Sequence, residues 1–86
     1  MENATIYKPR AIPLKEIEIN DIEADEFEAI RLCDFEKKSQ IAAAGKMCIS
    51  RGTVQRLLES GRYKIVKAFL NNEGIRIKNS DSWRST

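Results

Sequence analysis

The longest periodic pattern of apolar and polar residues in the chain runs from Ser50 to about Leu70. At ~100° per residue, its apolar residues form one broad stripe, and its polar residues lie on the opposite side of the predicted helix. The stripe contains Val54, Leu57, Leu58, Gly61, Ile65, Ala68 and Phe69, and the polar side contains Gln55, Arg56, Glu59, Arg62, Tyr63 and Lys67. The pattern predicts one long amphipathic helix with Ser50 as its N-cap. A second interpretation, in which Gly61 ends one helix and another follows, stays open.

Two shorter helices are predicted before it. Phe27, Ile30 and Cys33 recur every three residues between about residues 24 and 34, which places them on one helix face. Asn20 or Asp21 is the candidate N-cap of this helix. The next helix has Ser39 as its N-cap, covers "SQIAAAGKM" and ends near Met47. Its three consecutive alanines favour helix and let a neighbouring helix approach closely.

The segments on either side of the helices are predicted to be extended. Pro9 and Pro13 fix φ and remove backbone donors, so the chain near residues 7–14 is unsuited to helix. Ile75 and Ile77 alternate with polar residues, which is the period of a half-buried strand. A strand needs a partner, and we expect the two terminal segments to pair, either within one chain or across a dimer.

Composition and charge narrow the functional classes. The 86 residues suffice for one domain, and no run of apolar residues approaches the ~20 that a membrane helix needs. Residues 15–36 carry nine carboxylates against Lys15 and Arg31, a net of −7, whereas residues 37–70 carry eight basic residues against Glu59, a net of +7. One part of the molecule should therefore attract a polyanion that the other repels.

The same composition argues against catalysis and against a bound cofactor. The chain has no histidine, the commonest general base, and neither a glycine-rich phosphate loop nor a serine elbow is present. Two cysteines fifteen positions apart do not have the spacing of a zinc site, so we expect free thiols, no metal and no cofactor. The missing catalytic motifs therefore favour a protein that is not an enzyme. The first twenty residues lack the apolar core of a signal peptide, which favours a cytoplasmic protein.

The helices at residues 39–47 and 50–70 have the spacing of a helix-turn-helix unit. Counted from Gln40 as the first of twenty residues, Ala43 and Ala44 fall where the helices cross. Core positions fall on Met47, Ile49, Val54 and Leu57. Cys48 departs from the usual pattern, because its position in the turn favours φ above zero and commonly holds glycine.

These elements predict a mainly α fold. It is a three-helix helix-turn-helix domain with short extended N- and C-terminal segments that can pair as a small β-sheet. We expect an extended arm over residues 1–20, the helix-turn-helix domain over 21–70, and a strand with a loose tail over 71–86. The predicted core is Val54, Leu57, Leu58, Ile65 and Phe69, with Phe27, Ile30 and Met47 packed against it.

Four blocks of sequence resemble the DUF134 (UPF0251) family of predicted DNA-binding proteins. They are "YKPRAIPLKEIE" at 7–18, "ADEFEAIRLCD" at 24–34, "SQIAAAGKMCISRGTVQRLLESGRYKIVKAF" at 39–69 and "GIRI" at 74–77. The family's helix-turn-helix is similar to region 4 of sigma-70-type factors, so the resemblance implies a transcription-related protein of bacteria or archaea. Departures are Cys48 in the turn, Glu23 in place of a threonine cap, and Ile41 and Ala42 in place of acidic residues.

A helix-turn-helix unit reads base edges in the major groove with the N-terminal half of its second helix. The candidate base-reading residues are Arg51, Gln55 and Arg56, with Thr53 and Glu59 as lesser candidates. The candidate phosphate-binding residues are Ser39, Ser50, Gly52, Lys38, Lys46, Arg62, Lys64 and Lys67. Lys8 and Arg10 could form a minor-groove arm.

The sequence therefore predicts a sequence-specific regulator of transcription that binds double-stranded DNA and forms a homodimer. The alternative is a protein-interaction module whose basic helix docks on an acidic partner such as the transcription machinery.

Overall fold

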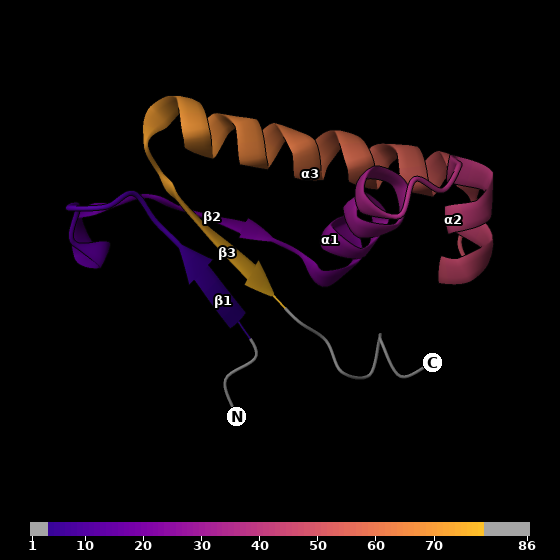
Figure 1. The fold of residues 1–86 in the computed structure, drawn as a ribbon, viewed down its shortest axis with the longest axis horizontal. Helices are drawn as coiled ribbons and strands as arrows, with labels where there is room; N and C mark the ends of the chain where they lie inside the picture. The colour runs from indigo at the N-terminus through magenta and orange to yellow at the C-terminus, as the bar shows by residue number, and fades with distance from the viewer. Residues whose placement is uncertain (1–3, 79–86) are drawn as a thin grey trace.

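The computed structural model describes residues 4–78, which form three strands and three α-helices (Figure 1). In chain order these are β1 (Ala4–Tyr7), a 3-10 turn (Leu14–Glu16), β2 (Ile19–Ile22), α1 (Ala24–Ile30), a π-helical turn (Arg31–Phe35), α2 (Gln40–Met47), α3 (Arg51–Asn71) and β3 (Gly74–Lys78). The tail predicted over the last residues of the chain lies outside the described part.

The strands form one mixed sheet in the order β1-β3-β2. β1 runs antiparallel to β3, with Ala4 opposite Lys78 and Tyr7 opposite Ile75. β2 runs parallel to β3, with Ile19 opposite Gly74 and Ile22 opposite Ile77. All three helices lie in the connection from β2 to β3, so α3 is followed directly by β3, the central strand of the sheet (Figure 1).

The prediction of a mainly α fold, with β structure only where the termini pair, is wrong. The two ends do pair within the chain, but the N-terminal strand is Ala4–Tyr7 and not the predicted segment near 7–14, of which only Tyr7 lies in a strand. In addition, β2 makes the sheet three-stranded and mixed. Asn20 and Asp21, interpreted from the sequence as helix caps, lie inside β2. The Asn20 amide donates to the backbone oxygen of Gly74 at 3.2 Å and to Glu73 Oε1 at 2.8 Å. Partners more than fifty residues away thus hold this segment as a strand.

The first helix begins at the residue after Glu23. Glu23 is its N-cap, in a reciprocal capping box with Glu26, whose Oε1 accepts a hydrogen bond from the Glu23 backbone N–H at 2.9 Å. α1 passes without a break into the π-helical turn, so helical structure continues to Phe35 as the apolar spacing predicted.

α3 is one continuous helix of 21 residues, which excludes the interpretation that Gly61 ends a first helix. Gly61 is buried against α1: a Cβ there would lie 2.7 Å from Ile30 Cδ1 and 3.3 Å from Glu26 Cβ. The glycine is therefore explained by the close approach of α1. The helix ends at Asn72, which has φ of 55°, and the Glu73 N–H donates back to the oxygen of Ala68 at 2.8 Å.

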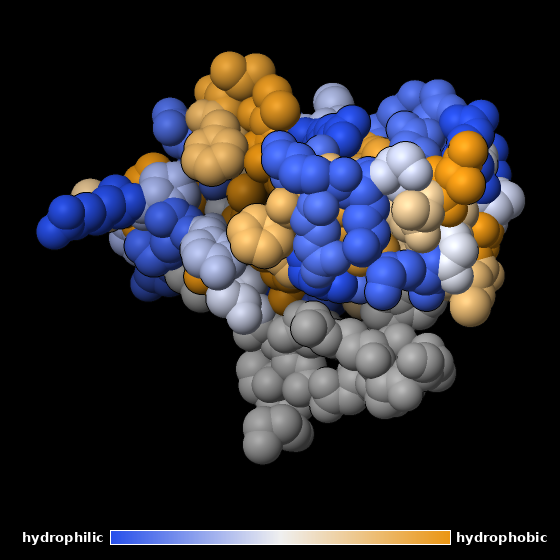
Figure 2. All heavy atoms as spheres, turned by 45° about the vertical axis from the view of Figure 1, so that its right-hand side comes forward, coloured by the Kyte–Doolittle hydropathy of each residue, from blue (hydrophilic) through white to orange (hydrophobic). Residues whose placement is uncertain are grey.

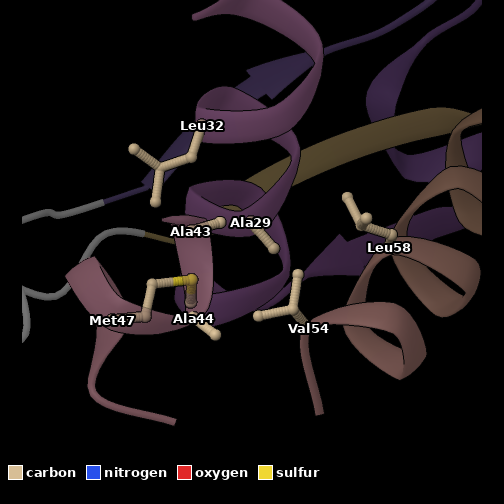
Figure 3. Packing of buried hydrophobic residues seen from close by; sticks show 7 residues of the cluster. All are labelled: Ala29, Leu32, Ala43, Ala44, Met47, Val54 and Leu58. Atoms are coloured by element: carbon tan, nitrogen blue, oxygen red, sulfur yellow. The ribbon is translucent and has the colours of Figure 1, made fainter. Parts of the chain in front are cut away.

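The main apolar cluster lies where α1, α2 and the first half of α3 meet. Figure 3 shows its seven side chains converging from these elements: Ala29, Leu32, Ala43, Ala44, Met47, Val54 and Leu58. Ala43 and Ala44 are both buried there, in keeping with the predicted close approach of the helices. Ile30, Ile49 and Leu57 pack around the cluster, half-buried.

The second half of α3 covers the sheet, where Ala68 and Ile22 are fully buried (Figure 1). Phe69, predicted as core, is instead 75% exposed. Phe69 is turned by ~100° around the helix from Ala68 and so points away from the sheet, because only the side of α3 toward Ala68 meets the sheet. Ile65 is half-buried. Among the residues that the structure describes, no helix is both long and apolar enough to cross a membrane.

Candidate nucleic-acid interface

α2 and α3 are joined by a tight left-handed turn. Cys48 has φ of 60° and ψ of 41°, as its place in the turn predicted, and the following Ile49 N–H donates to the oxygen of Ala44 at 3.1 Å. The side chain therefore occupies a conformation that glycine adopts at lower cost. The turn brings the start of α3 beside the start of α2.

Serine hydroxyls cap both helices, as predicted. Ser39 Oγ accepts a hydrogen bond from the Ala42 N–H at 3.0 Å, and Ser50 Oγ accepts one from the Thr53 N–H at 3.1 Å. Ser39 and Ser50 are both exposed, so the N-terminal amides of both helices face solvent. Gly52 is in the first turn of α3, and an added Cβ would meet only Ser50 Oγ, at 4.0 Å. The backbone there is open to a close approach.

The outer side of the first half of α3 carries a row of polar side chains. Arg51 Nη1 donates to Gln40 Oε1 at 3.1 Å and to Gln55 Oε1 at 3.4 Å. Gln55 Nε2 in turn donates to Glu59 Oε2 at 3.4 Å. Arg51, Gln55 and Glu59 are exposed, and they follow one another at intervals of four residues. The structure thus brings three of the candidate base-reading residues together in one line.

The other two candidates form a second, parallel row. Thr53 Oγ1 lies 2.8 Å from Ser50 Oγ and accepts a hydrogen bond from Arg56 Nη2 at 3.5 Å. Arg56 is exposed, whereas Thr53 is half-buried. The contact of Arg56 is long, and both contacts lie at the surface of the helix. They hold the side chains near the helix without burying them.

Gln40 also belongs to this surface, although the sequence did not indicate it as a candidate DNA-binding residue and it was used only to number the helix-turn-helix unit. Its amide oxygen accepts a hydrogen bond from Arg51, which links α2 to α3. The available signal was its place directly after the Ser39 cap, which puts a side chain beside the exposed helix N-terminus.

The candidate phosphate-binding residues divide into two groups. Lys46, at the end of α2, is exposed, and Lys38 is half-buried, with its ammonium 3.7 Å from Glu36 Oε1. Arg62, Lys64 and Lys67 are instead engaged with carboxylates of the same chain. Their partners are Asp34 for Arg62 at 2.7 Å, Glu26 for Lys64 at 2.8 Å, and Glu73 for Lys67 at 2.7 Å.

These ion pairs change the meaning of the charge asymmetry. Asp34 and Glu26 belong to the acidic stretch and Arg62 and Lys64 to the basic one, so the two stretches neutralise each other where α1 packs on α3. The hydrogen bonds that Arg62 donates to Asp34 raise the pKa of Arg62. Within residues 4–78, the basic residues of the 37–70 stretch that form no ion pair are Lys37, Lys46, Arg51 and Arg56. All four follow the π-helical turn and precede the middle of α3.

Glu26 is the buried member of this set, with 5% of its surface exposed. Burial alone would raise the pKa of Glu26, but hydrogen bonds from Lys64, Ser60 and the Glu23 backbone together hold it below its ordinary value. Lys64 Nζ also donates to the backbone oxygen of Asp21 at 2.8 Å, so one ammonium joins α1, α3 and β2.

The described residues contain no group of three or more histidine, cysteine or acidic side chains placed to hold a metal ion. Cys33 and Cys48 are free thiols, and burial raises the pKa of Cys33. Lys8 and Arg10 lie in the loop after β1, at the end of the molecule opposite α2 (Figure 1).

Comparison with known proteins assigns the sequence of this chain to a family. Residues 2–84 match the family model described as "Protein of unknown function DUF134". The chain is 43% identical over 81 residues to a UPF0251 protein of Methanocella arvoryzae, covering 94% of this chain and 49% of that protein. It is 47% identical over 72 residues to a UPF0251 protein of Dehalococcoides mccartyi strain BAV1, covering 84% of this chain and 62% of that protein.

A UPF0251 protein of Methanosarcina acetivorans is 45% identical over 78 residues, covering 91% of this chain and 46% of that protein. The chain thus spans about half to three fifths of the length of these relatives. No solved structure matches it. The resemblance inferred from its sequence blocks is confirmed, and the chain belongs to the DUF134 (UPF0251) family.

Proposed function

We propose that this chain is a sequence-specific DNA-binding protein that regulates transcription and inserts the N-terminal half of α3 into the major groove. The observation that carries the proposal is the exposed surface of α2 and the first half of α3. It combines two helix N-termini, two polar rows and three cations, Lys46, Arg51 and Arg56, that form no ion pair within the described chain. The α2–turn–α3 unit then acts as a helix-turn-helix.

The residue types of the two rows suit base edges. Arginine can donate two hydrogen bonds to guanine, and glutamine can pair with the donor and acceptor of adenine. Arg51, Gln55 and Arg56 supply these groups. Their present hydrogen bonds are to exposed neighbours at 3.1–3.5 Å, so exchanging them for base edges leaves no buried group unpaired. Thr53 and Glu59, at the margins of the rows, are lesser readers.

Phosphates would be held at the start of both helices. The capped N-termini at Ser39 and Ser50 direct amides and the positive end of the helix dipole outward, and Gly52 lets a sugar-phosphate strand come close to the backbone. Lys46 adds positive charge beside them. Lys38, Arg62, Lys64 and Lys67 contribute less in this proposal, because each would have to give up a carboxylate partner to bind a phosphate.

The proposal is tested by selecting duplexes from a random library with the purified chain and measuring affinity by fluorescence anisotropy against salt concentration. Each phosphate that a cation contacts adds about −0.9 to the slope of log K against log salt, so a surface that makes four such contacts predicts a slope of about −4. Arg56→Ala and Arg51→Ala should each weaken binding to the selected site by about 1–3 kcal/mol and relax its sequence preference. Lys46→Ala should weaken binding to all duplexes and flatten the slope by about 1.

Lys15→Ala is the matched control for Lys46→Ala, since it removes the same charge from an exposed residue of the 3-10 turn, at the end of the molecule opposite α2 (Figure 1). It should leave both affinity and slope nearly unchanged. No duplex binding at low salt, with the helical circular dichroism intact, would refute the proposal and favour the protein-interaction module instead.

A further inference from the structure

The second half of α3 is exposed and apolar on the side that faces away from the sheet. Tyr63, Val66, Phe69 and Leu70 are 66%, 54%, 75% and 76% exposed. They are spaced three and four residues apart, so they form one stripe along the helix. Figure 2 shows apolar atoms gathered over the C-terminal end of α3, beside the polar surface that covers much of the same view. We call these four residues the apolar stripe.

The apolar stripe is large for a free surface. With side chains of roughly 150–200 Å² each, it exposes on the order of 500 Å², near the upper end of the largest patch on a typical monomer. Tyr7, which is 58% exposed, extends it across a groove of about 210 Å³ that Tyr7, Pro9, Phe69 and Ile75 line in part. The extended surface approaches the ~800 Å² that each partner buries in a standard interface.

The charges on α3 beside the apolar stripe are already paired, and Lys8, which also lines the groove, donates from its ammonium to the backbone oxygens of Pro9 and Ile12 at 3.3 and 2.8 Å. Arg62 is paired with Asp34, and Lys67 is paired with Glu73. Hydrogen bonds from Asn20 and Lys67 lower the pKa of Glu73, so this pair is charged on both sides at neutral pH. A partner that covers the stripe therefore needs an apolar surface and no net charge of its own. A second copy of the same stripe meets this requirement.

We infer that the apolar stripe is the surface through which two copies of the chain form a dimer, with their α3 helices antiparallel and crossing near Val66. A two-fold interface must be complementary to itself. With the axis at Val66, Tyr63 of one copy lies opposite Phe69 and Leu70 of the other, because these positions are three to four residues on either side of the axis. Each Tyr63 then faces the groove beside the partner's Phe69.

This arrangement has a consequence that rests on the proposed function. Gln55 is eleven residues before Val66, so at 1.5 Å per residue the two copies of Gln55 lie roughly 33 Å apart along the antiparallel helices. Half-sites read by helix-turn-helix dimers are about 34–36 Å apart, which is one turn of B-DNA. Gln55 lies about 20° from Val66 around the helix, on the face that meets the partner, but six residues, roughly 9 Å, beyond the point opposite the end of the partner's α3. Arg56 lies about 80° from Val66, to the side of the partner helix.

The dimer is tested by sedimentation equilibrium of the full chain between about 1 and 100 µM. We expect the parent to be a dimer, and Val66→Glu to raise the dissociation constant at least ~30-fold by placing a charge at the axis. Leu70→Ser, which adds no charge, should weaken the dimer in the same direction. Ile41→Glu is the matched control, because Ile41 is 73% exposed on α2, away from the stripe, and should leave the dimer intact.

A parent chain that stays monomeric at 100 µM, or a dimer that Val66→Glu and Leu70→Ser leave unchanged, would overturn the inference. Sedimentation requires no DNA, so failure of the proposed function leaves this result untouched. If the proposed function holds, monomeric Val66→Glu should still bind a duplex with one half-site but lose its preference for two half-sites one turn apart. Retention of that preference by a monomer would contradict the spacing.

Discussion

Replacing Lys64 with methionine isolates the ion pair that joins α1 to α3. Methionine keeps most of the aliphatic stem but removes the ammonium, which donates to Glu26 Oε1 and to the Asp21 oxygen, both at 2.8 Å. The side chain of Glu26 is 7% exposed and that of Lys64 is 29% exposed. The carboxylate of Glu26 would therefore stay buried after its cation is lost.

The magnitude follows from this burial. Removing one partner of a fully buried ion pair costs about 3–5 kcal/mol, and the partial exposure of Lys64 lowers our expectation to about 2–3 kcal/mol at pH 7. For a domain of this size, such a loss lowers the Tm by roughly 10–20 °C. Loss of the ammonium also removes one of the groups that hold the pKa of Glu26 down, so that pKa should rise. The destabilisation should then shrink as the pH falls through the raised pKa of Glu26 in the variant, because protonation removes the buried charge.

Urea unfolding followed by circular dichroism at pH 7 and pH 4 measures both effects. Lys46→Met is the matched control, because Lys46 is exposed, and it should change stability by less than about 0.5 kcal/mol. Adding Glu26→Gln to Lys64→Met should recover part of the loss, since the amide oxygen can still accept the Glu23 N–H without a buried charge. The reasoning is refuted if Lys64→Met is as stable as the parent, or if Glu26→Gln does not improve it.

Three further predictions concern the whole domain and the turn. Asp21, Glu26 and Glu73 all have a pKa below the ordinary value in the folded protein. The stability that these three carboxylates contribute is therefore complete above about pH 5 and is lost as the pH falls through their pKa values in the folded state. Measuring the Tm over a range of acidic pH values would show this loss. Cys48→Gly should raise the free energy of unfolding by up to about 1 kcal/mol, because glycine adopts the left-handed backbone conformation at this position without strain. A clear decrease in the free energy of unfolding in urea would contradict this. Ser50→Ala removes the acceptor of the Thr53 N–H and should cost about 1 kcal/mol in the same assay, whereas no change would mean that the cap contributes nothing.

The sequence predicted the helices well because their signals are local. The caps at Ser39 and Ser50, the end of α2 at Met47 and the length of α3 each follow from residues within a few positions of one another. The positive φ of Cys48 also followed from its place between two predicted helices.

The sequence could not reveal β2 or the allocation of charges, because both depend on distant partners. Asn20 and Asp21 are common in helix caps and turns, and only β3, more than fifty residues later, makes this segment a strand. The net charges of residues 15–36 and 37–70 likewise predicted an acidic part of the molecule that contains Glu26 and a basic part that contains Lys64. In the structure these two side chains form an ion pair at 2.8 Å. Phe69 was assigned to the core because periodicity identifies an apolar residue without saying whether a neighbouring element covers it.

The order of the strands affects how the chain can fold during its synthesis. β3 is the last described element to leave the ribosome, yet it lies between β1 and β2 and supplies hydrogen bonds to both. The two N-terminal strands must therefore stay unpaired until residues 74–78 have emerged, whereas the cluster of α1, α2 and early α3 can assemble sooner. A ribosome stalled so that α3 has left the exit tunnel while β3 is still inside it should display a helical nascent chain whose N-terminal strands are still open to protease.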